Sequence, residues 1–417
     1  MALTRLASIG GTLRRVAVIG AGAAGAMAAI FASSAGAETL LLERTRDGGR
    51  KILISGGGRC NILPSRLDES RFITDSSVNT LRKILRSWRL EDQVTFFTQE
   101  AGLPLVEEVA SGKLFPASDR ARDVRDGLLG LAQQRGARFL SGCRVTALAA
   151  AGDRWNIERE GEPPLVADAV ILATGGLSVP KTGSDGAGLA FAGQLGHTIH
   201  PTYPALTPLI AQPAPFAALA GVSVPVTITA RAGELAATAT GGFLFTHHGY
   251  SGPAVLDVSH VAARAGANGF PAARLTVRWT RLDEGGCEAA LRPAGARTVA
   301  GLLRGELPER LALALLSSAG VAPTRLLSEL RREERVRLIE TLVRGVLPVT
   351  GHEGYGKAEV TGGGVSLAEI NPKTMESRIA PGLFLCGEML DAFGPIGGYN
   401  FVWAWVTGRA AGLGAAV

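Results

Sequence analysis

Gly20-Ala21-Gly22-Ala23-Ala24-Gly25 follows an apolar segment, 14–19, and leads into an alanine-rich segment, 24–35. Glycines at this G-x-G-x-x-G spacing stand where a turn is tight, where backbone approaches a phosphate, and where a helix packs on a strand. A second apolar segment, 39–43, ends in an acid that can accept hydrogen bonds from both hydroxyls of a ribose. The sequence therefore predicts a strand–helix–strand unit that binds a dinucleotide through Gly20, Gly22, Ala23, Ala24, Gly25 and Glu43.

A second glycine-rich segment lies near the far end of the chain. Gly397-Gly398-Tyr399-Asn400 opens an apolar stretch, 399–412, that we expect to be a helix. A helix start presents unpaired N–H groups and a positive dipole end, which stabilise the negative charge of a reduced flavin. The pyrophosphate of a dinucleotide needs one helix start, and a flavin ring, more than about 10 Å further along, needs a second. The two segments together predict bound FAD, because a nicotinamide-only enzyme does not need the second helix.

Three further segments complete the predicted cofactor site. Apolar strands at 170–172 and 382–386 run into small or acidic residues, and Glu388 is placed to hold a ribityl hydroxyl. The loop 47–61 is rich in glycine, so its N–H groups can approach the flavin without a bulky side chain between them. No histidine lies in this loop, and we expect FAD to be bound non-covalently. The added cofactor-binding residues are Arg44, Lys51, Ser55, Gly56, Gly57, Gly58, Arg59, Cys60, Asn61, Val145, Ala173, Thr174, Gly175, Gly176, Gly387, Glu388, Gly397, Gly398, Tyr399 and Asn400.

Composition and charge exclude several classes of protein. A chain of 417 residues is long enough for about two or three domains. The 43 Lys and Arg residues against 37 Asp and Glu leave a net charge of +6, and these charges are scattered rather than gathered in runs. No apolar run has the length to span a bilayer, so we expect a cytoplasmic protein without membrane or nucleic-acid partners. The four cysteines form no CxxC pair, which predicts reduced thiols rather than disulfides or a zinc site.

The pattern of apolar and polar residues changes at about residue 198. Short alternating stretches with Gly and Pro, such as 222–229 and 274–279, indicate strands, and leucines spaced by about 3.6 residues indicate helices between 298 and 346. After residue 357 the pattern of the first part returns. We predict an FAD-binding domain at 1–197 and 355–417, an inserted β-rich domain at 198–297 and 345–354, and a helical domain at 298–344.

Few side chains are candidates for catalysis, and we name Arg59, His247 and Tyr250. Arg59 either stabilises an anionic flavin or a substrate carbonyl, or pairs with a carboxylate and locks its loop. Its neighbour Cys60 has no partner cysteine nearby, which favours a small packing residue over a redox thiol. His247 and His248 are the best-placed groups for proton transfer and Tyr250 is a comparable donor, although each also fits a structural role.

The sequence contains one dinucleotide fingerprint, and no second G-x-G-x-x-G follows another strand. If NAD(P)H reduces the flavin, it must therefore bind transiently over the ring rather than in a second Rossmann domain.

Several blocks of the sequence resemble a known family. Lys51-Ile52-Leu53-Ile54-Ser55-Gly56-Gly57-Gly58-Arg59-Cys60-Asn61, Ser251-Gly252-Pro253-Ala254 and Thr361-Gly362-Gly363-Gly364-Val365 are similar to blocks of the BaiN/YhiN-like bacterial FAD flavoproteins. The resemblance spans nearly the whole chain and implies a discontinuous glutathione-reductase-type FAD domain, a β-rich insert and a small helical domain. Members are described as aminoacetone oxidase-like enzymes or bile-acid dehydro-steroid reductases, and the glycine loops are more distantly similar to fumarate reductase flavoproteins. His248 and Tyr250 lie in a further block of the resemblance, Phe245–Ala254, where we expect apolar residues instead. This departure leaves substrate preference open.

Four functions fit these observations. The preferred one is an FAD-dependent oxidoreductase that reduces a conjugated carbon–carbon double bond of a small molecule, with His247 or Tyr250 as proton donor. Amine oxidation with oxygen as acceptor is the alternative within the same class. A tRNA-modifying flavoenzyme is the third function and would need a basic surface to bind the RNA. The fourth is a redox sensor, in which reduction of the flavin would change a contact with another protein without catalytic turnover. The basic cluster available in the sequence is Arg331, Arg332, Arg335 and Arg337.

Overall fold

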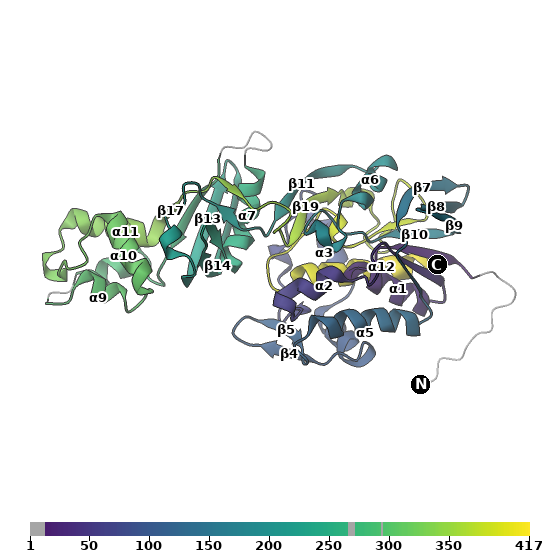
Figure 1. Cartoon of the computed structure of the whole chain (residues 1–417), viewed down its shortest axis with the longest axis horizontal. Helices are drawn as coiled ribbons and strands as arrows, with labels where there is room; N and C mark the ends of the chain where they lie inside the picture. The colour runs from purple at the N-terminus through teal and green to yellow at the C-terminus, as the bar shows by residue number, and fades with distance from the viewer. Residues whose placement is uncertain (1–12, 266–271, 293–294) are drawn as a thin grey trace. The chain divides into compact units, whose positions relative to one another are not determined.

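The computed structural model describes residues 13–265, 272–292 and 295–417, which fall into two units (Figure 1). The first unit contains the described residues up to Thr202 together with Val360–Val417, and the second contains the described part of Tyr203–Glu359. Each unit has its own apolar core. The chain leaves the first unit once and returns to it, so that unit is discontinuous in sequence.

A parallel five-stranded sheet forms the centre of the first unit. Its strand order is β20-β10-β1-β2-β6, and all neighbouring strands within it are parallel. Val16, Ala17 and Val18 on the central strand are 0% exposed, as expected of a sheet with both faces covered. This topology confirms the predicted α/β fold of the Rossmann type. The strands are β1 (Arg15–Ile19), β2 (Glu38–Glu43), β6 (Arg138–Ser141), β10 (Ala169–Leu172) and β20 (Leu383–Leu385), and the main helices are α1 (Ala23–Ser34), α5 (Ala121–Gln134) and α12 (Tyr399–Ala415).

Helix α12 lies directly against α1, and α5 packs against α1 as well (Figure 1). A Cβ atom at Gly408 would lie 2.3 Å from the carbonyl oxygen of Ala24, and one at Gly412 would lie 2.3 Å from that of Ala28. Glycine is therefore required at both positions for this approach. Because the register advances by four residues on both helices, the helices run in the same direction. At a rise of 1.5 Å per residue, α12 starts about 12 Å before α1 along that direction.

One predicted segment of the first unit differs in detail from the structure. The loop expected at 47–61 contains the short helix α2 (Arg50–Ile54) and a 3-10 turn at Ser55–Gly58. The chain then forms two further short helices, α3 (Val78–Leu85) and α4 (Leu90–Thr95). The smaller elements used below are β3 (Leu63–Pro64), β4 (Leu105–Glu108), β5 (Lys113–Pro116), β7 (Val145–Ala151), β8 (Arg154–Arg159), β9 (Glu162–Ala167), α6 (Ala187–Gln194), β11 (Ile199–Ala205), β19 (Val360–Val365) and the 3-10 turn η8 (Gly387–Met389).

A seven-stranded sheet of order β17-β16-β13-β14-β15-β12-β18 forms the second unit. Its neighbouring strands are antiparallel, and inward residues of β13 such as Val224, Val226 and Ile228 alternate with more exposed ones. Helix α7, which the sequence did not predict, begins at Pro253 directly after the left-handed Gly252. The elements are β12 (Leu209–Ile210), β13 (Ser223–Ala232), β14 (Leu235–Phe245), β15 (Gly249–Ser251), α7 (Pro253–Arg264), β16 (Arg274–Arg278), α8 (Glu284–Ala290), β17 (Gly345–Leu347) and β18 (Gly351–His352).

The leucine-rich region of the second unit forms helices α9 (Val299–Leu303), α10 (Glu309–Ala319) and α11 (Arg332–Arg344). Leu311 and Leu338 are buried in the same apolar core as the inward residues of the sheet. The helices and the sheet thus share one core, and the independence of 298–344 as a domain stays a prediction.

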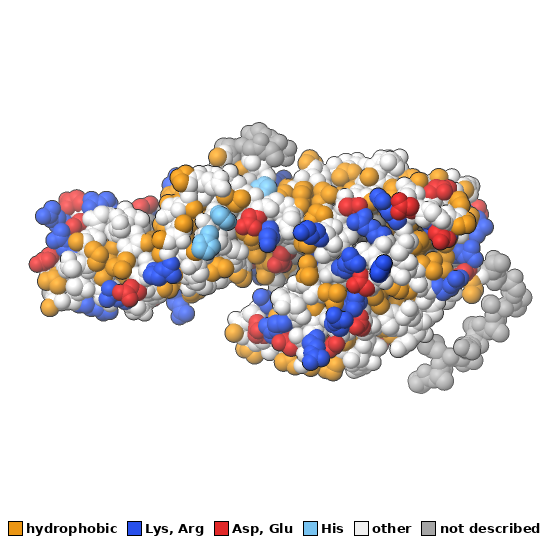
Figure 2. Space-filling view, viewed as in Figure 1, with side chains coloured by type: hydrophobic (Ala, Val, Ile, Leu, Met, Phe, Trp, Pro, Cys, Tyr) orange, Lys and Arg blue, Asp and Glu red, His pale blue; other side chains and the backbone are white. Residues whose placement is uncertain are grey.

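Charged side chains of both signs are mixed on the visible face of the molecule. On the face shown in Figure 2, blue Lys and Arg side chains are interspersed with red Asp and Glu side chains, as their scatter along the sequence suggests. No helix among the described residues combines the length and apolar character needed to cross a membrane. The same residues hold no group of three or more His, Cys, Asp or Glu side chains suited to a metal ion.

Replacement of Gly408 by Ala is expected to destabilise the protein by about 1–3 kcal/mol, because the added methyl group meets the Ala24 carbonyl. Urea denaturation followed by circular dichroism measures the change. Gly130→Ala is the matched control, since Gly130 also lies inside a helix but a Cβ there has nothing within 4 Å. We expect Gly130→Ala to stabilise by about 0.4–1 kcal/mol, and equal effects of the two substitutions would contradict the close packing of α1 and α12.

Candidate flavin-binding site

The three fingerprint glycines at the start of α1 have different surroundings. A Cβ at Gly20 would lie 2.6 Å from the Ala173 carbonyl oxygen, and one at Gly25 would lie 1.8 Å from that of Gly20. A Cβ at Gly22 would have nothing within 4 Å. Gly20 and Gly25 are therefore required by packing, whereas Gly22, the N-cap of α1, leaves open space in front of the helix. An open helix start without a capping side chain fits an incoming pyrophosphate.

Glu43 is held in place at the end of β2. It is 8% exposed, and its carboxylate accepts hydrogen bonds from the N–H of Ala21 at 2.8 Å and of Thr45 at 2.8 Å. The acid thus stands beside the fingerprint turn, where a ribose is expected. The neighbouring Arg44 forms an ion pair with Asp185, which neutralises the cation that would favour a 2′-phosphate.

Glu388 lies at the centre of a polar network. Its carboxylate accepts hydrogen bonds from the Thr361 N–H at 3.1 Å and the Thr361 hydroxyl at 3.0 Å, and also from Ser178 and from the ammonium group of Lys51. A Cβ at Gly176 would lie 2.4 Å from the Thr361 hydroxyl oxygen, so the exit of β10 packs on the same group. The structure therefore brings the predicted residues Lys51, Gly176 and Glu388 together.

The sequence reasoning missed two members of this network. Ser178 is 0% and Thr361 is 1% exposed, and the Thr361 hydroxyl also accepts a hydrogen bond of 2.7 Å from the Leu177 N–H. Thr361 directly precedes three glycines, a signal that marks backbone close to a ligand and that could have drawn it into the site. Nothing local marks Ser178.

A buried aspartate fixes the segment that carries Glu388. Asp391 is 2% exposed and accepts hydrogen bonds from the Ser76 hydroxyl at 2.7 Å and the Asp75 N–H at 3.0 Å. Burial raises the pKa of this carboxyl group. His200 adds its imidazole at 3.7 Å from the carboxylate. Sequence reasoning did not include this cluster in the site.

The glycine loop is tied to the start of α12 through Asn61. Its amide, oriented by its hydrogen-bonding pattern, accepts from the Gly398 N–H at 2.9 Å and donates to the Leu63 carbonyl at 2.9 Å. Gly56 and Gly57 have φ angles of 55° and 69°, which favour glycine. The glycine loop thus lies against the start of α12, and their joint contact with a flavin stays a prediction.

Arg59 is engaged by carboxylates. Its guanidinium donates to Asp119 at 2.6 Å and to Glu108 at 3.1 Å, and it lies 4.0 Å from the ring centre of Phe115. The hydrogen bond to Asp119 and, to a smaller extent, the one to Glu108 raise the pKa of Arg59. These contacts favour the loop-locking role over a catalytic one.

The remaining catalytic candidates lie in the second unit. His247 and His248 are exposed at the tip of the β14–β15 hairpin. Tyr250 is 1% exposed within an aromatic cluster, and its hydroxyl has no hydrogen-bond partner in the part of the chain that the structure describes. Burial raises the pKa of this phenol. The aromatic contacts of Tyr250 favour a packing role, whereas the side chains of His247 and His248 are accessible to solvent.

The other predicted cofactor residues are distributed as follows. Ala173 directly follows β10, and Tyr399 and Asn400 form the first turn of α12, where Asn400 exchanges two hydrogen bonds of 2.9 Å with Gly394. Val145 begins β7 in a separate three-stranded sheet, and its contact with the cofactor stays a prediction. The remaining residues lie in loops and turns: Ser55 and Gly58 in the 3-10 turn after α2, Thr174 and Gly175 in the loop after β10, Gly387 at the start of η8, and Gly397 just before α12.

The chain is similar to several known proteins. A family model described as "HI0933-like protein Rossmann domain" matches residues 14–414. The chain is 34% identical to a 3-dehydro-bile acid delta(4,6)-reductase from Clostridium scindens over 97% of this chain and 99% of that protein. It is 33% identical to a ribosomal RNA dihydrouridine synthase from Escherichia coli over 93% and 94% of the two chains. A solved 3-ketosteroid-delta4-(5alpha)-dehydrogenase from Rhodococcus jostii is 18% identical, with a TM-score of 0.49 and coverage of 97% of both chains.

Substitution of Gly22 by Val is expected to weaken FAD binding by about tenfold or more, because the side chain fills the open space before α1. Stability without FAD should change by less than about 0.5 kcal/mol, since the new Cβ meets nothing within 4 Å. Flavin fluorescence on dilution measures the affinity, and thermal unfolding of the apoprotein measures stability. Gly25→Val is the control that should fail to fold, and wild-type affinity of Gly22→Val would contradict the assignment.

Cys60 is expected to resist alkylation in the native protein. It is 0% exposed, and burial raises its pKa to about 12, so the thiolate is scarce at neutral pH. We expect iodoacetamide at pH 8 to label Cys60 about a thousandfold more slowly in the native than in the urea-unfolded protein. Peptide mass spectrometry measures the rates, and rapid native labelling would restore a redox role for this thiol.

Proposed function

The chain belongs to the HI0933-like Rossmann family and is an FAD-dependent oxidoreductase, and we propose that it reduces a carbon–carbon double bond conjugated to a carbonyl group. The observation that carries the proposal is the parallel contact of α1 and α12, whose N-terminal ends have no capping side chain and are offset by about 12 Å along the shared helix direction. One start fits a pyrophosphate and the other the charged edge of a flavin ring.

The names of the relatives support reduction over oxidation. The relative from Clostridium scindens is named a delta(4,6)-reductase, and those from Escherichia coli and Haemophilus influenzae are named dihydrouridine synthases. Dihydrouridine is uridine with hydrogen added across the ring double bond that stands next to a carbonyl group. Both names therefore describe saturation of the same kind of bond, on substrates of very different size.

The residues of the first unit suit FAD and would hold it at separate points along its length. The open N-terminus at Gly22 would receive the pyrophosphate, Glu43 a ribose, and Glu388 with its partner Lys51 the ribityl chain. The positive end of the α12 dipole would stabilise negative charge on the ring. When bound, FAD supplies hydride transfer at N5, and the protein contributes position and electrostatics.

Saturation of a conjugated double bond also needs a proton, and we assign its delivery to His247. Histidine exchanges protons well near neutral pH, and His247 is exposed at a hairpin tip. The buried phenol of Tyr250 and the doubly paired guanidinium of Arg59 are less suited to release a proton.

A nucleobase within RNA is the second candidate substrate. It is favoured by the two relatives named ribosomal RNA dihydrouridine synthases, which align with 93% and 95% of this chain. The basic cluster on α11 lends it little support, because Arg335 pairs with Glu288 at 3.2 Å and Arg337 donates to the Ala319 carbonyl at 3.0 Å. Amine oxidation and a redox-sensor role have no comparable support.

Anaerobic flavin reduction separates these functions. We expect NADH or NADPH to bleach the bound flavin, and a conjugated ketone or a uridine-containing RNA to restore its visible absorption. A flavin that bleaches with amines and never with either nucleotide would overturn the reductase assignment in favour of amine oxidation. Reduced flavin that no added acceptor reoxidises would favour the sensor.

Replacement of His247 by Gln is expected to slow reoxidation by the substrate about 100-fold, in the range of general acid catalysis, and to leave reduction by NAD(P)H unchanged. His248→Gln is the matched control, since it removes the adjacent exposed imidazole. Stopped-flow absorbance measures both half-reactions separately. Equal rates for the two variants would remove His247 from the reaction.

A further inference from the structure

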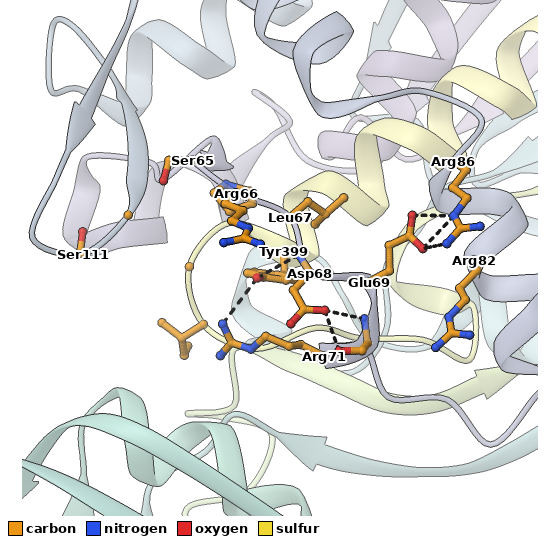
Figure 3. Close-up of a pocket in the computed structure, with 15 residues that line it drawn as sticks. Ser65, Arg66, Leu67, Asp68, Glu69, Arg71, Arg82, Arg86, Ser111 and Tyr399 are labelled. Carbon is orange, nitrogen blue, oxygen red and sulfur yellow. Dashed lines mark hydrogen bonds and ion pairs between the residues drawn. The ribbon is translucent and has the colours of Figure 1, made fainter.

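An open cavity of about 820 Å³ lies in the first unit beside the start of α12 (Figure 3). Its walls come from the segment after β3, from the turn between β4 and β5, from α3 and from the residues before α12. Gly397 and Tyr399 belong both to these walls and to the predicted flavin-binding set. The charged side chains that line the cavity are Arg66, Arg71, Arg82 and Arg86, with Asp68 and Glu69.

Cationic charge exceeds anionic charge around this cavity. Arg86 donates to both carboxylate oxygens of Glu69 at 2.9 Å, which neutralises that pair. Arg66 and Arg82 form no ion pair with any carboxylate that the structure describes. Arg82 as a whole residue is half-exposed. A recess of this kind stabilises a bound anion.

The cavity is connected to the helix start that the flavin is expected to use. The Tyr399 hydroxyl accepts hydrogen bonds from the Asp68 N–H at 3.4 Å and from Arg71 at 3.5 Å, and the Arg71 guanidinium lies 5.2 Å from the tyrosine ring centre. Figure 3 shows Arg66 and Arg71 near Tyr399, with Arg82 and Arg86 on the side of Glu69. An anion in the cavity would therefore lie next to the first turn of α12.

We propose that this cavity is a subsite for the phosphate groups of a nucleotide whose ring reacts at the flavin, an inference that rests on the proposed function. Guanidinium groups bind phosphate oxygens in pairs, which matches a wall lined by arginines. The sequence has one dinucleotide fingerprint, so the phosphates of a second nucleotide need a different cationic site. The cavity volume is within the usual range for ligand sites. The nucleotide is either a free nicotinamide nucleotide or part of an RNA strand.

Binding to the oxidised, FAD-loaded protein tests the proposal without turnover. The probes are NADP⁺, NAD⁺ and a fluorescein-labelled oligouridine, titrated by calorimetry or fluorescence anisotropy at about 50 mM and about 200 mM salt. In the double variant Arg66→Gln/Arg82→Gln we expect the affinity for at least one probe to fall by about tenfold or more. Its flavin content and visible spectrum should equal those of the wild type.

Lys83→Gln/Arg89→Gln is the matched control, because it removes two exposed cations from the same region that do not line the cavity. Loss of NADP⁺ and NAD⁺ binding confined to the arginine variant identifies the reductant as the ligand, and loss of oligouridine binding identifies an RNA strand. Similar losses in both double variants, or no binding of any probe to the wild type, would overturn the proposal. Intact binding in a protein that reduces no double bond would overturn the proposed function instead and leave the subsite standing.

Discussion

The close contact between α1 and α12 is the constraint on which the cofactor site depends. Glycines at 408 and 412 let two backbones approach more closely than any side chain would allow, and the equal spacing on both helices makes them parallel. Parallel helices present both positive ends in one direction. Their offset then decides how far apart two negatively charged parts of one ligand can be held, and here it suits an extended dinucleotide.

The local parts of this arrangement could be predicted from the sequence. The fingerprint glycines, Glu43 and the second glycine pair each carry their meaning in a few neighbouring residues, so the α/β fold and the two helix starts follow from spacing. Partners distant in sequence could not be predicted. Ser178 and Thr361 enter the site through hydrogen bonds to Glu388, which lies 210 and 27 positions away from them, and Arg59 is engaged by acids 49 and 60 positions away. Helix α7 was missed because its start immediately follows a strand in a region of strand-like texture.

The charged groups of the predicted cofactor site and those of the neighbouring cavity differ in how completely they are paired. Those of the predicted cofactor site are paired within the protein: Lys51 with Glu388, and Arg44 with Asp185. Such pairing keeps the side chains in fixed positions and limits the net charge that a bound cofactor meets. Among the arginines that line the neighbouring cavity, Arg86 pairs with Glu69, whereas Arg66 and Arg82 form no ion pair with a described carboxylate, so this surface differs from the predicted cofactor site.

The ion pair between Lys51 and Glu388 joins residues 337 positions apart, and the glycines that fix α12 come later still. During synthesis, the N-terminal fingerprint leaves the ribosome long before its counterpart exists. The nascent chain therefore contains only part of the predicted cofactor site for most of its translation. Its apolar strands must stay folded or shielded from water without the ligand. We therefore expect FAD to bind stably only after the chain is complete.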